Sequence, residues 1–164
     1  MKITLPPLTP AQMMQGAMAG VLRQVSALKN KRVGAYGSSG ENDWQYHIEG
    51  CLGELAFARW VDRFWDGKIN DLSAGDVGKF EVRTAPEDWK RLIMHDEDID
   101  YARFYFVTGR NGNYVVHGWI LGSDAKDRKY WKDPVGGRPA YFVPKSALHP
   151  KLTVVQVPGV KEGE

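Results

Sequence analysis

Cysteine is nearly absent from this chain: Cys51 is the only one among 164 residues. A single cysteine excludes an internal disulfide and any zinc site built from several cysteines, and its apolar helical context is typical of a buried small side chain. No apolar run approaches the 18 residues of a membrane-spanning helix, and the first residues do not form a secretion signal. We therefore expect a soluble, cytoplasmic protein.

Several common catalytic patterns are also missing. The chain contains no Gly-x-Ser-x-Gly elbow, no Gly-Lys-Ser phosphate loop and no closely spaced histidine pair. Of the four histidines, only His47 falls near a candidate site. These absences argue against a serine hydrolase, a phosphate-loop nucleotidase and a histidine-based zinc enzyme.

The length and the 43% apolar content predict one folded domain rather than a disordered chain. We expect a single domain over residues 1–164. It comprises an N-terminal helix and loop (1–40), a core (41–157) and a disordered tail (158–164).

The net charge of +2 conceals a segregation of charge along the chain. Residues 1–40 contain five basic residues and no acidic one, residues 41–100 contain fifteen acidic residues against seven basic ones, and residues 101–164 contain ten basic residues against five acidic ones. An acidic middle between basic ends suits a carboxylate metal centre with a phosphate-attracting rim, although solvated charges also cluster by chance.

The first strong pattern predicts a helix from about Pro10 to Lys29. Thr9 suits the N-cap, with Gln12 as its partner in a capping box. An apolar stripe recurs at helical spacing, which favours packing into the core over a groove for a partner. The stripe consists of Met14, Met18, Val21, Val25 and Leu28.

A second helix is expected from about Glu41 to Trp65. On its helical wheel Glu54 lies on the apolar face, whereas Glu49, Arg59 and Arg63 lie on the opposite, solvent side. A carboxylate that points into a core is costly unless it is paired, protonated or bound to metal. Glu54 is therefore a candidate functional residue.

The rest of the chain alternates in the manner of β-strands, with an Asn111-Gly112 hairpin signal between two of them. Two helices followed by strands predict an α+β or mixed α/β fold with one sheet. The expected strands are Lys79–Thr84, Leu92–His95, Ala102–Thr108, Tyr114–Leu121 and Ala140–Val143.

Candidate metal ligands cluster around the first of these strands. Asp76 lies in a glycine turn, Glu81 follows on the strand, and Lys79 and Arg83 share the strand face of Glu81. Carboxylate oxygens suit Mg²⁺ or Mn²⁺, and nearby cations can stabilise charge on a phosphate. A surface hairpin with solvated ion pairs remains the alternative.

These motifs resemble the PD-(D/E)XK nuclease superfamily, including uncharacterised phage and bacterial members with a Glu-Val-Arg-Thr core. The resemblance covers about residues 47–84 and extends more loosely to about residue 150. It implies a restriction-endonuclease-like mixed sheet flanked by helices. The motifs are Gly50-Cys51-Leu52-Gly53-Glu54-Leu55-Ala56, Gly75-Asp76 and Glu81-Val82-Arg83-Thr84.

The resemblance implies roles for individual residues. Glu54 would be the helical carboxylate, and Asp76, Glu81 and the Val82 carbonyl would hold the metal. Arg83 replaces the lysine of the family; it cannot act as a general base, but it can bind the scissile phosphate. Lys79 would partly replace the missing lysine, and the Asp76–Glu81 spacing is shorter than is usual in the family.

A basic and aromatic segment is the candidate surface for nucleic acid, although a solvated loop would have the same composition. We expect a Mg²⁺- or Mn²⁺-dependent nuclease acting on nucleic acid, with DNA the expected substrate, and leave a homodimer open. The alternatives are a catalytically inactive nuclease-fold module that binds DNA or protein, and an unrelated α+β domain. The segment comprises Lys126, Arg128, Lys129, Trp131 and Lys132.

Overall fold

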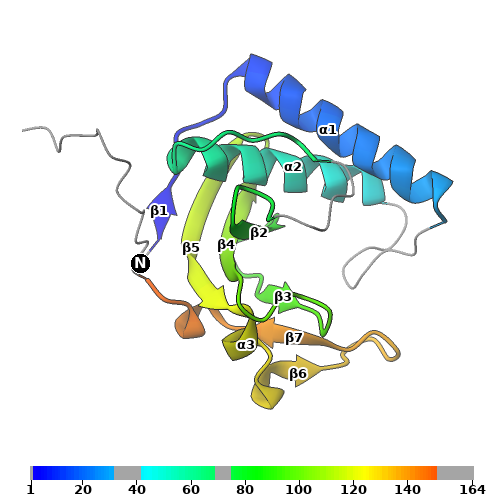
Figure 1. The fold of residues 1–164 in the computed structure, drawn as a ribbon, viewed down its shortest axis with the longest axis vertical. Helices are drawn as coiled ribbons and strands as arrows, with labels where there is room; N and C mark the ends of the chain where they lie inside the picture. Colours follow the sequence, from blue (N-terminus) through cyan, green and yellow to red (C-terminus); the bar gives the residue numbers. More distant parts are fainter. Residues whose placement is uncertain (1, 32–41, 69–74, 151–164) are drawn as a thin grey trace, which may run out of the picture.

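Two helices precede two β-sheets in the computed structural model, which describes residues 2–31, 42–68 and 75–150 (Figure 1). The α+β class, the N-terminal helix pair and a mixed sheet are confirmed. The expected tail 158–164 and most of the loop expected after the first helix lie outside the described residues. The elements are β1 (Ile3–Thr4), α1 (Pro10–Lys29), α2 (Asp43–Trp60), β2 (Phe80–Ala85), β3 (Leu92–Met94), β4 (Arg103–Arg110), β5 (Asn113–Leu121), α3 (Gly122–Ala125), η1 (Arg128–Tyr130), β6 (Trp131–Lys132), β7 (Ala140–Val143) and η2 (Lys145–Ala147).

The larger sheet has the strand order β1-β5-β4-β2. Strands β4 and β5 form an antiparallel hairpin, β1 adds antiparallel to β5, and β2 runs parallel to β4. The expectation of one sheet is wrong, because β3, β7 and β6 form a second, antiparallel sheet. Short strands separated by loops do not reveal from sequence which sheet they join.

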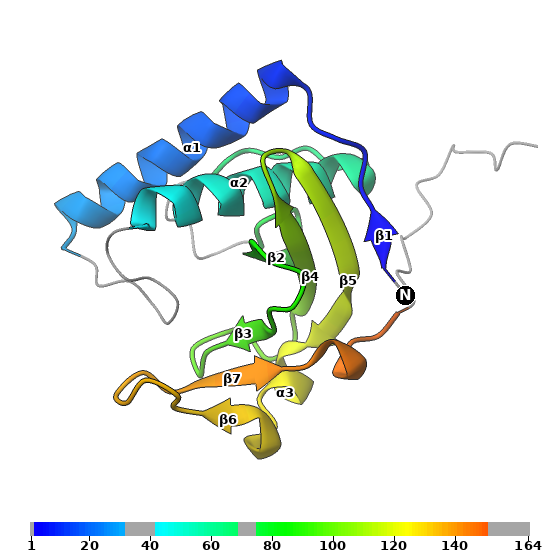
Figure 2. The ribbon, with the colours of Figure 1, turned by 180° about the vertical axis from the view of Figure 1, so that it is seen from behind.

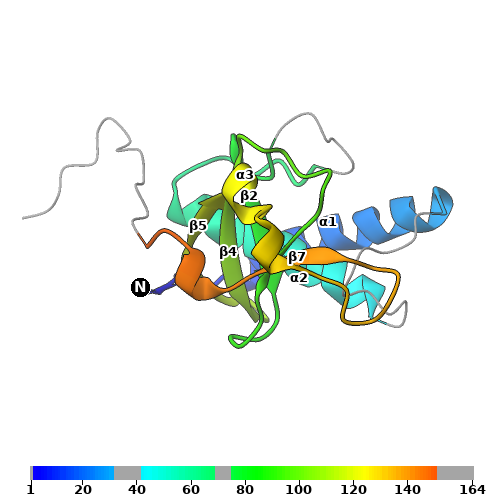
Figure 3. The ribbon, with the colours of Figure 1, turned by 90° about the horizontal axis from the view of Figure 1, so that it is seen from below.

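The molecule is built in layers, with α1 on α2, α2 on one face of the larger sheet, and the second sheet on the other face (Figures 1 and 2). Seen from below, α3 and β7 lie in front of β4 and β5 (Figure 3). Alternate residues of β4 enter the two cores: Tyr105 packs towards α2, and Phe106 towards the second sheet. On β2, Phe80 and Val82 belong to the α2 core, so Glu81 and Arg83 point to the opposite face.

Helix α1 has the predicted bounds, because its capping box forms. The Thr9 N–H donates to Gln12 Oε1 over 2.8 Å, and the Gln12 N–H donates to Thr9 Oγ1 over 3.4 Å. Helix α2 ends earlier than predicted, at Trp60, and Asp62 then adopts a left-handed conformation with φ of 52°.

The apolar stripe of α1 does not face the core, contrary to the sequence-based expectation. Met14, Met18 and Leu28 are 74%, 62% and 59% exposed. The buried face contains Gly16, Ala19, Gly20 and Gln24 instead. Small residues allow two helix backbones to approach closely, and here this close approach decides which face of α1 is covered.

The turn between β4 and β5 fulfils its sequence signal, since Asn111 and Gly112 have φ of 53° and 83°. This hairpin explains why Glu49 is buried, although the helical wheel placed it in solvent. The Glu49 carboxylate accepts hydrogen bonds from the Tyr114 hydroxyl, the Asn111 N–H and the Gln45 amide, and so ties α2 to the hairpin. Across the described part of the chain, no helix has both the length and the apolar character needed to cross a membrane.

Two glycines provide a matched test of the helix packing. A Cβ at Gly20 would lie 2.5 Å from Ile48 Cα, whereas a Cβ at Gly50 would meet nothing within 4 Å. We expect Gly20→Ala to lower the free energy of unfolding by about 1–2 kcal/mol, because backbone must move. Gly50→Ala should raise it by about 0.5–1 kcal/mol through helix propensity. Urea denaturation measures both, and equal effects would contradict the proposed packing.

Candidate functional site

Asp76 lies beside the outer edge of β2. A tight turn joins Val77 to Phe80 through two backbone hydrogen bonds of 3.0 Å. The Val82 N–H donates to Asp76 Oδ2 over 2.8 Å. Strand β2 is the last in its sheet, and no described strand pairs with its other edge. Because the N–H and C=O of one residue in an extended strand point to the same side, the Val82 carbonyl also faces this edge.

Glu81 brings a second carboxyl group to Asp76. Burial is the largest cause that raises the pKa of Glu81, to about 7. The charge of Asp76 raises it further, as does a hydrogen bond between the two carboxyls, whereas Arg83 lowers it. Two carboxyl groups this close repel each other when both are ionised, so the pair attracts either a proton or a cation.

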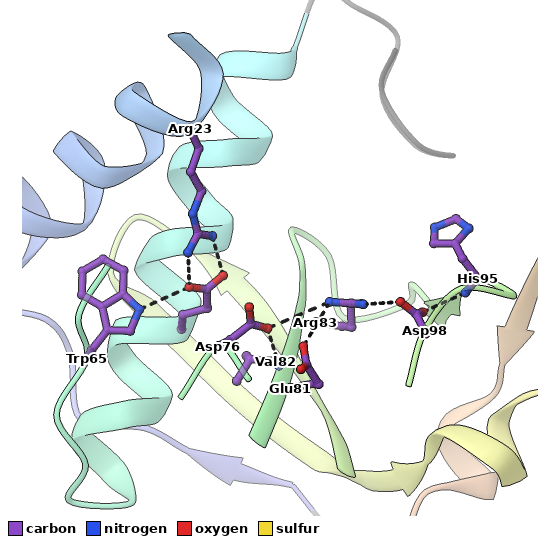
Figure 4. Close-up of polar contacts among 9 residues, drawn as sticks. Arg23, Trp65, Asp76, Glu81, Val82, Arg83, His95 and Asp98 are labelled. Atoms are coloured by element: carbon purple, nitrogen blue, oxygen red, sulfur yellow. Dashed lines mark hydrogen bonds and ion pairs between the residues drawn. The ribbon is translucent and has the colours of Figure 1, made fainter. Parts of the chain in front are cut away.

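Arg83 connects this pair to the loop before β4 (Figure 4). Its Nη1 lies 4.0 Å from Asp76 Oδ2 and 4.0 Å from Glu81 Oε2, while its Nη2 donates to Asp98 Oδ1 over 2.8 Å. The guanidinium also lies 5.1 Å from the centroid of the Phe104 ring. Asp98 in turn accepts a hydrogen bond from the His95 N–H. This bond fixes the Asp98 carboxylate, which holds the Arg83 guanidinium in place.

Glu54 is buried, as predicted, but it is already paired. Arg23 of α1 donates to both of its oxygens, over 2.6 and 2.8 Å, and the Trp65 indole N–H donates over 3.2 Å. Arg23 Nε is also engaged, with the Lys68 carbonyl. Burial and then the charge of Asp76 raise the pKa of Glu54 to about 6, whereas Arg23 opposes the rise. Glu54 therefore belongs to a structural ion pair whose field reaches Asp76.

Sequence reasoning missed Arg23, Trp65 and Asp98. Arg23 carried a usable signal, because it lies on the same face of α1 as Gly16 and Gly20 and opposite the apolar stripe. Asp98 carried none, since an acidic loop is normally solvated. His47 is half-buried; burial first, and then the charge of Arg23, lower its pKa.

The remaining candidate cations are distributed differently from the prediction. Lys79 lies in the exposed turn before β2, with its ammonium 5.9 Å from the Phe80 ring centroid. Lys126 donates to the backbone of Asp96 and Asp98 and to the Asp100 carboxylate, so it stabilises the acidic loop rather than presenting a free charge.

The other four residues of the basic segment lie on η1 and β6. Three of them are exposed bases, Arg128, Lys129 and Lys132; Lys129 forms an ion pair with Asp127. Trp131 is 38% exposed and packs edge-on against Tyr141. This segment therefore presents positive charge and an aromatic ring at the surface.

In residues 2–31, 42–68 and 75–150, no group of three or more histidine, cysteine, aspartate or glutamate side chains is placed to hold a metal ion. The candidate donors are instead two carboxylates, Asp76 and Glu81, and the Val82 carbonyl. This set suits Mg²⁺, which is bound by one or two carboxylates and retains several waters.

A scan of protein-family models, a search of curated proteins and a search of solved structures found no match to this chain. The function is therefore inferred from the geometry of the chain itself. Asp76 and Glu81 lie together at the outer edge of β2, beside Arg83, whose other side is bound by Asp98. On the α2 side, the charge of Asp76 acts on the buried carboxylate of Glu54.

The Arg23–Glu54 pair predicts a stability effect. Arg23→Gln should lower the free energy of unfolding by about 3 kcal/mol, because it leaves the Glu54 carboxylate buried without its partner. The control Arg63→Gln removes an exposed arginine just after α2 and should change stability by less than about 0.5 kcal/mol. Thermal and urea unfolding measure both variants, and similar losses would show that the pair does not hold the helices together.

Proposed function

We propose that this chain is a Mg²⁺- or Mn²⁺-dependent nuclease of the PD-(D/E)XK type, which hydrolyses phosphodiester bonds of DNA. The observation that supports this most is the apposition of Asp76 and Glu81 at the open edge of β2. Burial and the charge of Asp76 raise the pKa of Glu81, so an ionised Glu81 beside Asp76 is costly to maintain unless a cation compensates the charge.

The donor set fits a hard divalent cation. Asp76 and Glu81 would each supply a carboxylate oxygen, and the Val82 carbonyl would supply a third. When bound, such a cation lowers the pKa of a coordinated water and neutralises charge on a phosphate. Asp76 now accepts a hydrogen bond from the Val82 N–H. On binding the cation, the Asp76 carboxylate would either give up this hydrogen bond or keep it and bind the cation as well.

In this proposal Arg83 binds the substrate phosphate. Its guanidinium contacts the acidic pair on one side and Asp98 on the other. A guanidinium has five donors, so it can keep its bond to Asp98 and still donate to phosphate oxygens. Because it stays protonated, Arg83 stabilises developing negative charge and does not accept a proton.

Glu54 is a positioning residue in this proposal. Arg23 and Trp65 fix its carboxylate, and the charge of Asp76 acts on that carboxylate and raises its pKa. The surface on η1 and β6, with Arg128, Lys132 and Trp131, would contact the DNA backbone and stack on exposed bases.

One observation favours a second candidate, an inactive nuclease-fold module that binds DNA. Arg83 lies within 4.0 Å of both Asp76 and Glu81, so its charge already compensates part of theirs. If Arg83 takes the place of the metal, the fold would bind DNA without cleaving it.

Calorimetric titration with Mn²⁺ tests the metal site. We expect one site in the wild type and none in Asp76→Asn, with the fold retained. Because the pKa of Glu81 is raised to about 7, binding must displace its proton at lower pH. Affinity should therefore fall below pH 7, approaching about tenfold per pH unit. Asp124→Asn, at an exposed position on α3, is the control; equal binding by wild type and Asp76→Asn would refute the site.

A cleavage assay with Mg²⁺ and Mn²⁺ over single- and double-stranded DNA separates the two candidates. Arg83→Ala should reduce the rate by roughly 10²–10³, the scale of one lost transition-state donor, and Arg83→Lys should retain cleavage. The exposed Arg63→Ala should behave as wild type. No cleavage by any of these proteins, with DNA affinity intact, would favour the inactive module.

A further inference from the structure

The outward face of α1 has a heptad pattern. Met14, Met18, Val21, Val25 and Leu28 are spaced alternately by four and three residues, which is the a/d spacing of a coiled-coil seam. Seen from behind, α1 lies on the outer side of α2, away from both sheets (Figure 2). Its buried residues Gly16 and Gly20 lie on a different face of the helix, which packs on α2.

This seam is exposed at Met14, Met18 and Leu28 and half-buried at Val21 and Val25. The first three residues are more than half exposed, and Leu22, on one flank, is 46% exposed. Contiguous apolar side chains on one helix face are a signature of an interaction surface. The nuclease site does not use this face, since Arg23 points from α1 towards α2.

Charge limits the kind of partner that fits. Between Pro10 and Leu28 the only charged residue of α1 is Arg23, and Arg23 is bound inward to Glu54. A helix that lies on an anionic membrane needs lysines or arginines beside its apolar face, and α1 has only Lys29 at its end. An uncharged face, by contrast, lets two identical copies meet without repulsion.

We propose that α1 is the dimer interface of this protein, with the α1 helices of two copies packed antiparallel about a two-fold axis. This inference goes beyond the proposed nuclease activity and does not require it. With the axis between residues 19 and 20, Met18 faces Val21 of the other copy, Met14 faces Val25, and Leu28 faces Ala11. Each layer sets a larger side chain against a smaller one, which is how helix layers interdigitate.

The length of the seam sets the strength of the contact. From Ala11 to Leu28 it extends about 26 Å at 1.5 Å per residue. A two-helix contact of this length is at the small end of specific interfaces. We therefore expect a dimer that forms at micromolar concentrations rather than a permanent one.

Sedimentation equilibrium of the full chain at about 1–200 μM tests the dimer. The wild type should dimerise, and Met18→Glu should weaken association at least tenfold, because it places a charge in two central layers. Tyr101→Glu, at a residue that is 86% exposed and outside α1, should leave association unchanged. A wild type that stays monomeric throughout, with or without binding of anionic vesicles, would overturn the proposal, as would a dimer that Met18→Glu does not weaken.

Engineered cysteines test the antiparallel geometry, since Cys51 is buried. Ala11→Cys and Leu28→Cys proteins, mixed and oxidised, should form a crosslinked heterodimer. Leu28→Cys alone should not crosslink, because its two copies would be about 26 Å apart at 1.5 Å per residue. Crosslinking of Leu28→Cys alone, without the mixed product, would overturn the antiparallel arrangement.

Discussion

The buried ion pair between Arg23 and Glu54 is the interaction on which the other features of this structure depend. It joins α1 to α2, and through Trp65 and Lys68 it also holds the segment after α2. Arg23 can reach Glu54 because Gly16 and Gly20 let the two helices approach. The same contact leaves the apolar seam of α1 outside and places a fixed negative charge beside Asp76.

The edge position of β2 is the second constraint. An edge strand exposes backbone groups that must find partners, and here Asp76 accepts a hydrogen bond from one of them, the Val82 N–H. That bond brings Asp76 to Glu81, whose side chain lies on the face away from the α2 core. The hydrogen bond that satisfies the Val82 N–H therefore also brings the carboxyls of Asp76 and Glu81 together. Arg83 and Asp98 complete this polar cluster.

Local signals in the sequence predicted local structure well. The capping box of Thr9 and Gln12 gave α1 its bounds, and the alternation and Asn111-Gly112 gave the β4–β5 hairpin. The burial of Glu54 also followed from its helical wheel. The orientation of α1 did not, because the apolar stripe and the small-residue face were competing signals, and tertiary packing chose the second.

Long-range pairing explains most of what the sequence could not predict. Arg23 and Glu54 are 31 residues apart, and Arg83 and Asp98 are 15 apart, so no spacing rule links them. The parallel pairing of β2 with β4 and the separate β3-β7-β6 sheet likewise depend on how distant segments meet. The sequence predicted that Asp76 and Glu81 lie close together only because a tight turn separates them.

The most direct test of the proposed site is a crystal structure of the protein soaked in Mn²⁺, with anomalous scattering used to locate the ion. We expect one strong peak at the outer edge of β2, about 2.0–2.6 Å from carboxylate oxygens of Asp76 and Glu81 and from the Val82 carbonyl. A map without a peak there, with Asp76 still bonded to the Val82 N–H and Arg83 in its present place, would contradict the account.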